Sequence, residues 1–225
     1  KESLGEGGRG GTASRRRKRL RNTFVVGQIA VALALLTGAG ELRQLMNSLV
    51  YADNGFNADG VLTFQLSLPQ YRYSDPTAVR QVTEEVLRTL DAVPGVDRAA
   101  SLVGLPRGRT IPSTRFGVEG EVYANPDDRP QTNWDAVSPG FLEALQVPMV
   151  SGRWLETTDR EDTPLVAVVN REFARRFFPG EEVIGKRIEM RGETREIVGM
   201  VQDFMQRRIP FDGLLEPCVF LPAAQ

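Results

Sequence analysis

The chain has 225 residues, and its 28 Lys and Arg nearly balance its 29 Asp and Glu, which gives a formal net charge of −1. It has no histidine and a single cysteine, Cys218, which excludes Ser-His-Asp and Cys-His catalysis, imidazole zinc sites and an internal disulfide. The charge is unevenly distributed: residues 1–22 hold eight basic and two acidic residues, whereas residues 23–225 hold 20 basic and 27 acidic ones, a net −7. A basic tail and an acidic body separated by an apolar segment are typical of a chain divided by a membrane.

Residues 1–22 are predicted to be a cytoplasmic basic linker, because they are rich in Gly, Ser and charge. The next stretch, Phe24 to Gly40, has 17 uncharged and mostly apolar residues, close to the lower limit of about 17–25 needed to cross a bilayer. A single span must be helical, because unsatisfied backbone groups are costly in hydrocarbon. The six basic residues within 15–21 place that flank in the cytoplasm. We therefore predict a transmembrane helix and stalk over 23–50, with membrane lipid as its surroundings.

Alternative interpretations of this segment are a buried core helix and a signal peptide. A core helix rarely lacks charge for so long after such a basic run. A signal peptide is supported by Ser14-Arg15-Arg16 and by Gly38-Ala39-Gly40, but a start at Lys1 indicates an internal fragment and no small-x-small cleavage site is clear. A nucleic-acid patch is disfavoured, because no aromatic residues lie among the arginines. We favour a retained membrane helix, whose small residues every fourth position from Ala30 would allow another helix to approach.

Residues 51–104 are predicted to form a βαβ unit. Val61 to Leu68 alternates between apolar and polar residues, as in a strand with one buried face. Ser74-Asp75-Pro76 starts a helix with a capping side chain and a first-turn proline, and Pro94-Gly95 ends it. Val96 to Val103 is the second predicted strand.

Residues 105–225 are predicted to be a second, mixed α/β subdomain. A loop over 104–115 precedes a first strand, and Asn170 is predicted to cap a helix that carries Phe173 and Phe177. A short helix is expected after Ser138-Pro139, over 141–145. The predicted strands are 116–123, 133–137, 165–169, 195–201 and 219–221.

Two motif matches do not predict binding sites. Gly180 to Arg187 follows a P-loop as far as Gly-x4-Gly-Lys, but it has Arg where Ser or Thr must bind magnesium, and it follows a helix instead of a strand. The acidic residues of 156–162 lack the spacing of an EF-hand, so a solvated acidic loop is expected there. We predict no catalytic, cofactor-binding or metal-binding residues.

The chain resembles the periplasmic core domain of MacB/FtsX-type ABC transporter permeases, and most closely the duplicated orphan permeases of that superfamily. The residues that carry the resemblance are Val147 to Arg153, Val166 to Asn170, Phe173 to Gly180, Ile184-Gly185-Lys186 and Ile197 to Asp203, with Phe24 to Gly40 and Gly55-Phe56 upstream. Glu41 departs from the pattern, because an apolar residue is usual there.

The resemblance implies an α+β fold: one N-terminal transmembrane helix, then an extracytoplasmic domain with a βαβ porter-like part and a second mixed α/β subdomain. It also implies a bacterial inner-membrane location, with the globular domain periplasmic or extracellular. The implied role is non-catalytic export or mechanotransmission, with another permease half or subunit and possibly a separate ABC ATPase as partners. The open alternatives are a membrane-anchored sensor or ligand-binding domain and a hydrolase that uses Ser or carboxylates.

Overall fold

The computed structural model describes residues 11–50, 55–69, 71, 73, 75–102, 112–204 and 215–225. The chain divides into two compact units, Lys1–Ala52 and Asp53–Gln225. The boundary predicted between residues 104 and 105 lies outside the described residues, so it stays a prediction.

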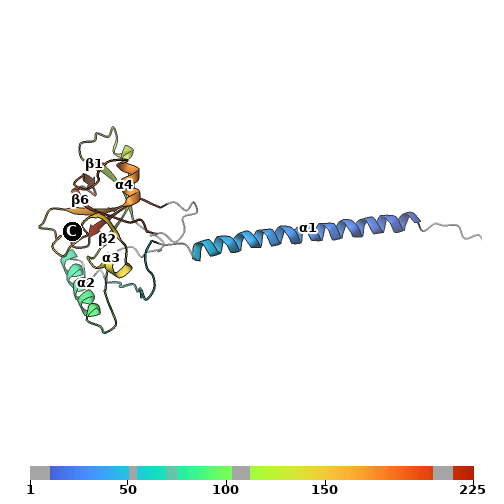
Figure 1. Ribbon diagram of the computed structural model, residues 1–225, viewed down its shortest axis with the longest axis horizontal. Helices are drawn as coiled ribbons and strands as arrows, with labels where there is room; N and C mark the ends of the chain where they lie inside the picture. The colour runs from blue at the N-terminus through green and yellow to red at the C-terminus, as the bar shows by residue number, and fades with distance from the viewer. Residues whose placement is uncertain are drawn as a thin grey trace, which may run out of the picture. The chain divides into compact units, whose positions relative to one another are not determined.

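The first unit contains one long helix, α1 (Gly11–Val50), shown in Figure 1. Its residues Arg17–Gln44 are long and apolar enough to cross a membrane. Residues 11–22 are helical, so α1 extends into the segment predicted to be the cytoplasmic basic linker, which stays a prediction. The physical reason is that Arg, Lys, Leu and Ala are good helix formers and here extend a helix that the apolar segment already nucleates.

The second unit begins with the predicted helix, α2 (Pro76–Asp91). The Asp75 side chain accepts a hydrogen bond of 3.0 Å from the Thr77 amide, and Pro76 occupies the first turn. This N-cap is the one that the sequence predicts. Gly95 lies in the turn that follows α2 and has a φ of +90°, a conformation that favours glycine.

The two strands predicted on either side of α2 are wrong. Neither 61–68 nor the described part of 96–103 forms a strand, and the only pairing recorded there is an isolated antiparallel bridge between Leu102 and Val137. Leu62 is 86 % exposed and Phe64 58 % exposed. An alternation of apolar and polar residues suits a strand with one buried face. A strand also needs a neighbouring strand with which to exchange backbone hydrogen bonds.

Seven strands of the described chain form one mixed sheet in the order β3-β6-β4-β7-β2-β1-β5. Their bounds are β1 (Ser113–Val118), β2 (Gln131–Val137), β3 (Met149–Gly152), β4 (Val166–Asn170), β5 (Arg187–Met190), β6 (Glu193–Val201) and β7 (Cys218–Pro222). A short 3-10 helix, η1 (Pro126–Asp128), lies between β1 and β2. The long strand β6 also pairs with β5, so six of the strands form a closed ring of pairings and the sheet curls back on itself.

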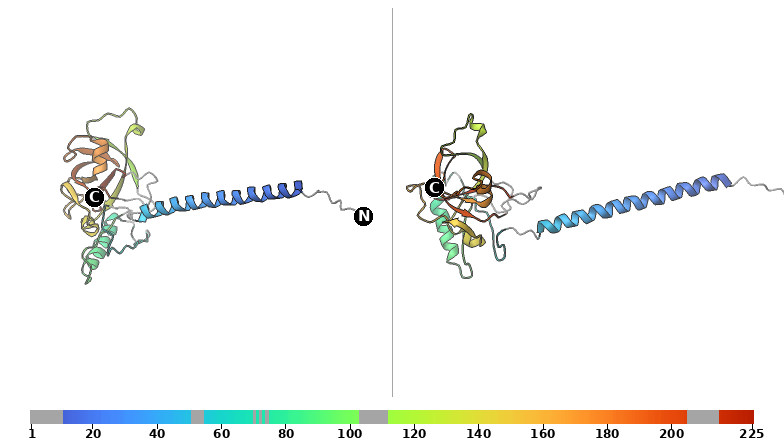
Figure 2. Two further views of the ribbon diagram at one scale, coloured as in Figure 1. Left: turned by 45° about the vertical axis from the view of Figure 1, so that its right-hand side comes forward. Right: turned by 45° about the horizontal axis from the view of Figure 1, so that its top comes forward.

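Two apolar clusters pack on the two faces of this sheet. Along β4, Val166 and Val168 belong to one cluster, whereas Ala167 and Val169 belong to the other, as the period of two requires. Helix α3 (Phe141–Leu145) covers the first face and α4 (Arg171–Phe177) covers the second. Figures 1 and 2 show α2 and α3 on the same side of the sheet and α4 on the other.

Most elements predicted for the second part are confirmed. The strands at β2, β4, β6 and β7 and both short helices form, and the Asn170 side chain accepts a bond of 3.1 Å from the Phe173 amide at the start of α4. The predicted loop over 104–115 is wrong for its last residues, because β1 begins at Ser113, and the strand predicted over 116–123 is wrong after Val118, where β1 ends. Strands β3 and β5 are not predicted from the sequence. The hairpin turn from β5 to β6, Arg191-Gly192, has φ values of +56° and +84°, both positive as in a type I′ turn.

Candidate functional site at the junction between the two parts of the domain

The junction is the set of contacts between the first part of the domain, residues 55–102, and the second part, residues 112–204 and 215–225. It starts at Gly55, whose φ is +71° and whose position leaves no room for a side chain: a Cβ there would lie 2.4 Å from the Asp203 carbonyl oxygen. Phe56 packs edge-on against Phe204, with ring centroids 6.4 Å apart. The Asn57 amide donates to the Leu145 carbonyl at 2.9 Å. These contacts attach the start of the domain to the second part.

A second attachment lies where the chain returns after α2. The Ser138 amide donates to the Ser101 carbonyl at 2.9 Å, and the Ser101 amide donates to the Ser138 hydroxyl at 2.9 Å. A Cβ on Gly140 would lie 2.9 Å from the Ala99 carbonyl oxygen, so the two backbones are in close contact. Two short backbone attachments therefore hold the first part at its two ends.

Between these attachments, α2 contacts the second part through ion pairs. Arg80 Nη1 lies 3.0 Å from Glu161 Oε1, and Arg160 Nη2 lies 3.9 Å from Glu84 Oε1. Each side thus contributes one cation and one anion. One side chain of each pair is more than half exposed, Glu161 at 62 % and Arg160 at 53 %, and their partners Arg80 and Glu84 are 25 % and 41 % exposed, so each pair is worth about 0.2–1 kcal/mol.

The loop that presents Arg160 and Glu161 is held by an ion pair whose carboxylate is buried. Arg153 donates from Nη1 and Nη2 to the two oxygens of Asp159, at 2.9 and 2.8 Å, and the Glu156 amide donates to Asp159 Oδ2 at 2.7 Å. Burial alone would raise the pKa of Asp159, but the hydrogen bonds and the charge of Arg153 lower it overall. The prediction of a solvated acidic loop is therefore wrong for Asp159, which fixes the loop from within, and right for the exposed Glu161.

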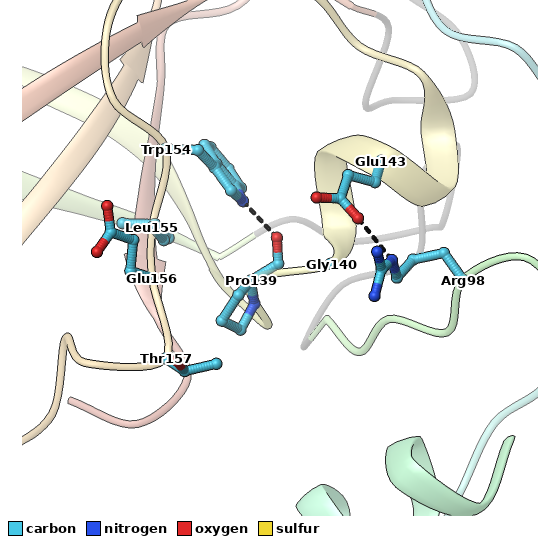
Figure 3. A pocket seen from close by; sticks show the side chains of 8 residues that line it. All are labelled: Arg98, Pro139, Gly140, Glu143, Trp154, Leu155, Glu156 and Thr157. Atoms are coloured by element: carbon cyan, nitrogen blue, oxygen red, sulfur yellow. Dashed lines mark hydrogen bonds and ion pairs between the residues drawn. The ribbon is translucent and has the colours of Figure 1, made fainter. Parts of the chain in front are cut away.

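A pocket of about 410 Å³ opens beside this junction, as Figure 3 shows. Its lining residues come from the segment after α2, from the start of α3 and from the loop after β3: Arg98, Pro139, Gly140, Glu143, Trp154, Leu155, Glu156 and Thr157. Arg98 Nε lies 2.5 Å from Glu143 Oε2, and Trp154 Nε1 donates to the Pro139 carbonyl at 2.8 Å. The Arg98–Glu143 pair joins the two parts beside the opening. The pocket is therefore an open region of the junction.

Asp203 is a second carboxylate held at the junction, beside Gly55. Its Oδ1 accepts a bond of 2.7 Å from the Glu172 amide at the start of α4. Burial raises the pKa of Asp203, the charge of Glu172 raises it further, and the hydrogen bond from the Glu172 amide opposes them. The Glu172 carboxylate is itself bound by Arg175 at 2.7 and 2.8 Å. Two carboxylates and one guanidinium therefore meet where the first part is attached.

The residues of the P-loop-like segment contact other groups of the protein. In the segment that resembles a P-loop, the Lys186 ammonium pairs with Glu181 at 2.7 Å, and the Gly185 amide donates to the Ile197 carbonyl at 2.8 Å. Among the described residues, no group of three or more His, Cys, Asp or Glu side chains is placed to bind a metal ion. The junction residues Arg80, Arg160 and Asp203 carry no local motif, so the sequence alone does not identify them.

A family model described as the MacB-like periplasmic core domain matches residues 23–225. An uncharacterized ABC transporter permease, YvrN of Bacillus subtilis (strain 168), is 24 % identical over 206 residues, which cover 88 % of this chain and 46 % of that protein. The chain thus spans about half the length of this curated relative.

Two solved structures are also similar to this chain. One is the periplasmic region of MacB from Actinobacillus actinomycetemcomitans, with 14 % identity, a TM-score of 0.45, and coverage of 63 % of this chain and 55 % of that one. The other is the extracellular domain of the noncanonic ABC-type transporter YknZ from Gram-positive bacteria, with 16 % identity, a TM-score of 0.42, and coverage of 62 % of each chain.

Proposed function

The chain belongs to the family of MacB-like periplasmic core domains, and on this premise we propose that it is the extracytoplasmic core, with one membrane helix, of an ABC-type permease that acts in export or mechanotransmission across a bacterial inner membrane. The observation that carries the proposal is the extent of the family match, 23–225, which covers both the apolar part of α1 and the whole sheet domain. Its partners would be another permease half or subunit and a separate ATPase.

The domain is non-catalytic in this proposal, and its carboxylates support that. Asp159 is bound by Arg153 and serves the loop, whereas Asp203 binds the start of α4. Cys218 is buried in β7 and lines the first apolar cluster. The sequence has no histidine, the side chain most often used for acid–base catalysis.

The junction supports a mechanical role. The first part is attached to the second at two short backbone contacts, near Gly55 and Ser101, and between them α2 makes two partly exposed ion pairs with the second part. Such ion pairs break at little cost, whereas packed backbone contacts do not. In this proposal the first part tilts about its two attachments.

The orientation of the chain is tested with single cysteines in a Cys218→Ala background. We expect Thr194→Cys, on the exposed side of β6, to react with a membrane-impermeant maleimide in intact spheroplasts. Asn22→Cys, on the basic flank of α1, should react only after permeabilisation. The reverse labelling pattern would place the basic flank outside and contradict the proposed location.

The partner is tested by purifying the full-length protein from detergent-solubilised membranes and identifying what comes with it by mass spectrometry. Recovery of a nucleotide-binding ATPase is the expected result. Recovery of signalling proteins without an ATPase would contradict the energised permease and favour the membrane-anchored sensor. The sensor has little structural support, because the groups that line the pocket near Arg98 and Glu143 are already bound to one another.

A further inference from the structure

A collar of basic side chains surrounds α1 next to its apolar segment. The collar consists of Arg17, Lys18, Arg19 and Arg21, all of them exposed and all on continuous helix. No acidic residue occurs in α1 before Glu41, so within this helix the collar carries four uncompensated positive charges. At the other end of the apolar segment, Glu41 and Arg43 cancel.

The position of the collar along the helix matches a layer of lipid headgroups. Arg21 lies three residues before Phe24, the first residue of the apolar segment, and Arg17 lies seven before it, which is about 4.5 Å and about 10 Å along the axis. The headgroup region on each side of the hydrocarbon is about 5–8 Å deep, so Arg21 lies within it and Arg17 just beyond it. Long Arg and Lys side chains near the end of a membrane helix extend into this region.

The distribution of the collar around the helix favours several lipid headgroups as partners over one partner protein. At about 100° per residue, Lys18, Arg19 and Arg21 point about 100°, 200° and 40° away from Arg17, so the charges cover more than half of the circumference. A partner protein in a groove would contact one side of the helix, whereas headgroups of the lipid annulus contact every side. Because the helix already continues through 17–21, no further ordering of the backbone opposes their binding.

We propose that the collar binds the anionic headgroups of phospholipids, so that the chain selects anionic over zwitterionic lipid around α1. This inference rests on α1 spanning the membrane, as in the proposed function. The chemistry is the pairing of guanidinium and ammonium groups with phosphate oxygens, which is strongest for lipids that carry a net negative charge.

The test reconstitutes the full chain in vesicles that contain trace spin-labelled phosphatidylglycerol or spin-labelled phosphatidylcholine, and measures the motionally restricted fraction of each by electron paramagnetic resonance. We expect phosphatidylglycerol to associate about threefold more than phosphatidylcholine. The variant R17Q/K18Q/R19Q/R21Q, which keeps Arg15 and Arg16, should lower this ratio clearly. Arg43→Gln, at the opposite end of the same helix, is the matched control and should keep the ratio.

Further arms separate the possible sources of the effect. The variant R17K/R19K/R21K should keep the ratio, because charge and not the guanidinium shape is required. Inorganic phosphate at constant ionic strength should leave it unchanged, and competition by phosphate would overturn the assignment to lipid. Equal association of both lipids with the wild-type chain would also overturn the assignment. So would a quadruple variant that keeps the wild-type ratio, because the collar would then have another partner.

Carbonate extraction of the same vesicles separates this inference from the proposed function. A wild-type chain that is washed out of the membrane would contradict the span itself. A chain that stays in the membrane without headgroup selectivity would contradict only the collar. If the quadruple variant fails to insert, the double variant R17Q/R21Q, which removes the two charges on one side of the helix, should still lower the ratio measurably.

Discussion

Arg153 binds both carboxylate oxygens of Asp159, at 2.8 and 2.9 Å, and this pair lies beneath the loop that reaches out to α2. The Asp159 side chain is 7 % exposed, whereas that of Arg153 is 41 % exposed, so the carboxylate is anchored inside and the guanidinium closes the loop from outside. The loop is therefore a rigid support that presents Arg160 and Glu161 to α2.

Replacing Asp159 by Asn should destabilise the domain by about 1.5–3 kcal/mol, because hydrogen bonds to a charged partner are lost. Since the folded state lowers the pKa of Asp159, its contribution is fully present above the unfolded pKa, near 4, and is lost as the pH falls through the folded value. Urea unfolding of the full chain in detergent, followed by tryptophan fluorescence, measures both effects. Both tryptophans of the sequence, Trp134 and Trp154, lie in the domain. Equal stability of wild type and variant at pH 7 would contradict this prediction.

Replacing Gly55 by Ala should cost clearly more stability than the same change at Gly60. Both glycines have a positive φ, +71° and +75°, so an alanine is strained by about 1–2 kcal/mol at either position. Only at Gly55 would the new Cβ also meet backbone, 2.4 Å from the Asp203 carbonyl oxygen, whereas no atom lies within 4 Å at Gly60. The same urea experiment compares the two variants, and equal losses would show that the junction does not depend on this contact.

The sequence predicts well wherever a local signal decides the structure. Asp75 with Pro76, and Asn170, show where α2 and α4 begin, and the apolar run from Val166 shows a strand buried on both faces. Each of these depends on residues within a few positions along the chain. The same holds for the apolar part of α1.

The sequence-based prediction fails where a residue far away along the chain decides the structure. The alternation at 61–68 predicts a strand, but no described neighbour pairs with it, so Leu62 stays exposed. The pairs between Arg80 and Glu161 and between Glu84 and Arg160 join residues about 80 positions apart, and nothing in either segment indicates the other. The buried state of Asp159 is missed for another reason: its partner Arg153 is only six positions away, but no motif marks the pair.

Replacing Asp203 by Asn should stabilise the domain at neutral pH and reduce its pH dependence. Because burial raises the pKa of Asp203 in the folded state, the native protein binds more protons than the unfolded one between the two pKa values, and stability falls as the pH rises through that window. An Asn keeps an oxygen to accept the Glu172 amide and removes the repulsion between the carboxylates. Urea midpoints from pH 4 to 8 measure the slope. A steeper slope in the variant would refute the assigned cause.

Replacing Gln225 by Ala should destabilise the domain by about 1.5–3 kcal/mol. Its side-chain oxygen accepts from Arg195 Nη1 at 3.0 Å and from the Val166 amide at 3.1 Å. Arg195 is 3 % exposed, and its Nε is already a buried donor with no hydrogen-bond partner in the described structure. Losing a second acceptor leaves more of a buried charge unsatisfied. The matched control is Gln202→Ala, because Gln202 is held through its backbone amide, at 3.0 Å from the Pro148 carbonyl.

The ion pairs of α2 should prove weak, and that weakness bears on the proposed function. A double-mutant cycle with Arg80→Gln and Glu161→Gln isolates their coupling energy, which we expect to be about 0.2–1 kcal/mol and to shrink in high salt. Neutral replacements are preferred to charge reversal, because a new acid at position 80 would face Glu84 one helical turn away. A second cycle with Glu84→Gln and Arg160→Gln serves as comparison, and its longer distance of 3.9 Å predicts the smaller coupling. Coupling of more than about 2 kcal/mol in either cycle would mean that α2 is fixed to the second part, and the proposed tilting of the first part would then be wrong.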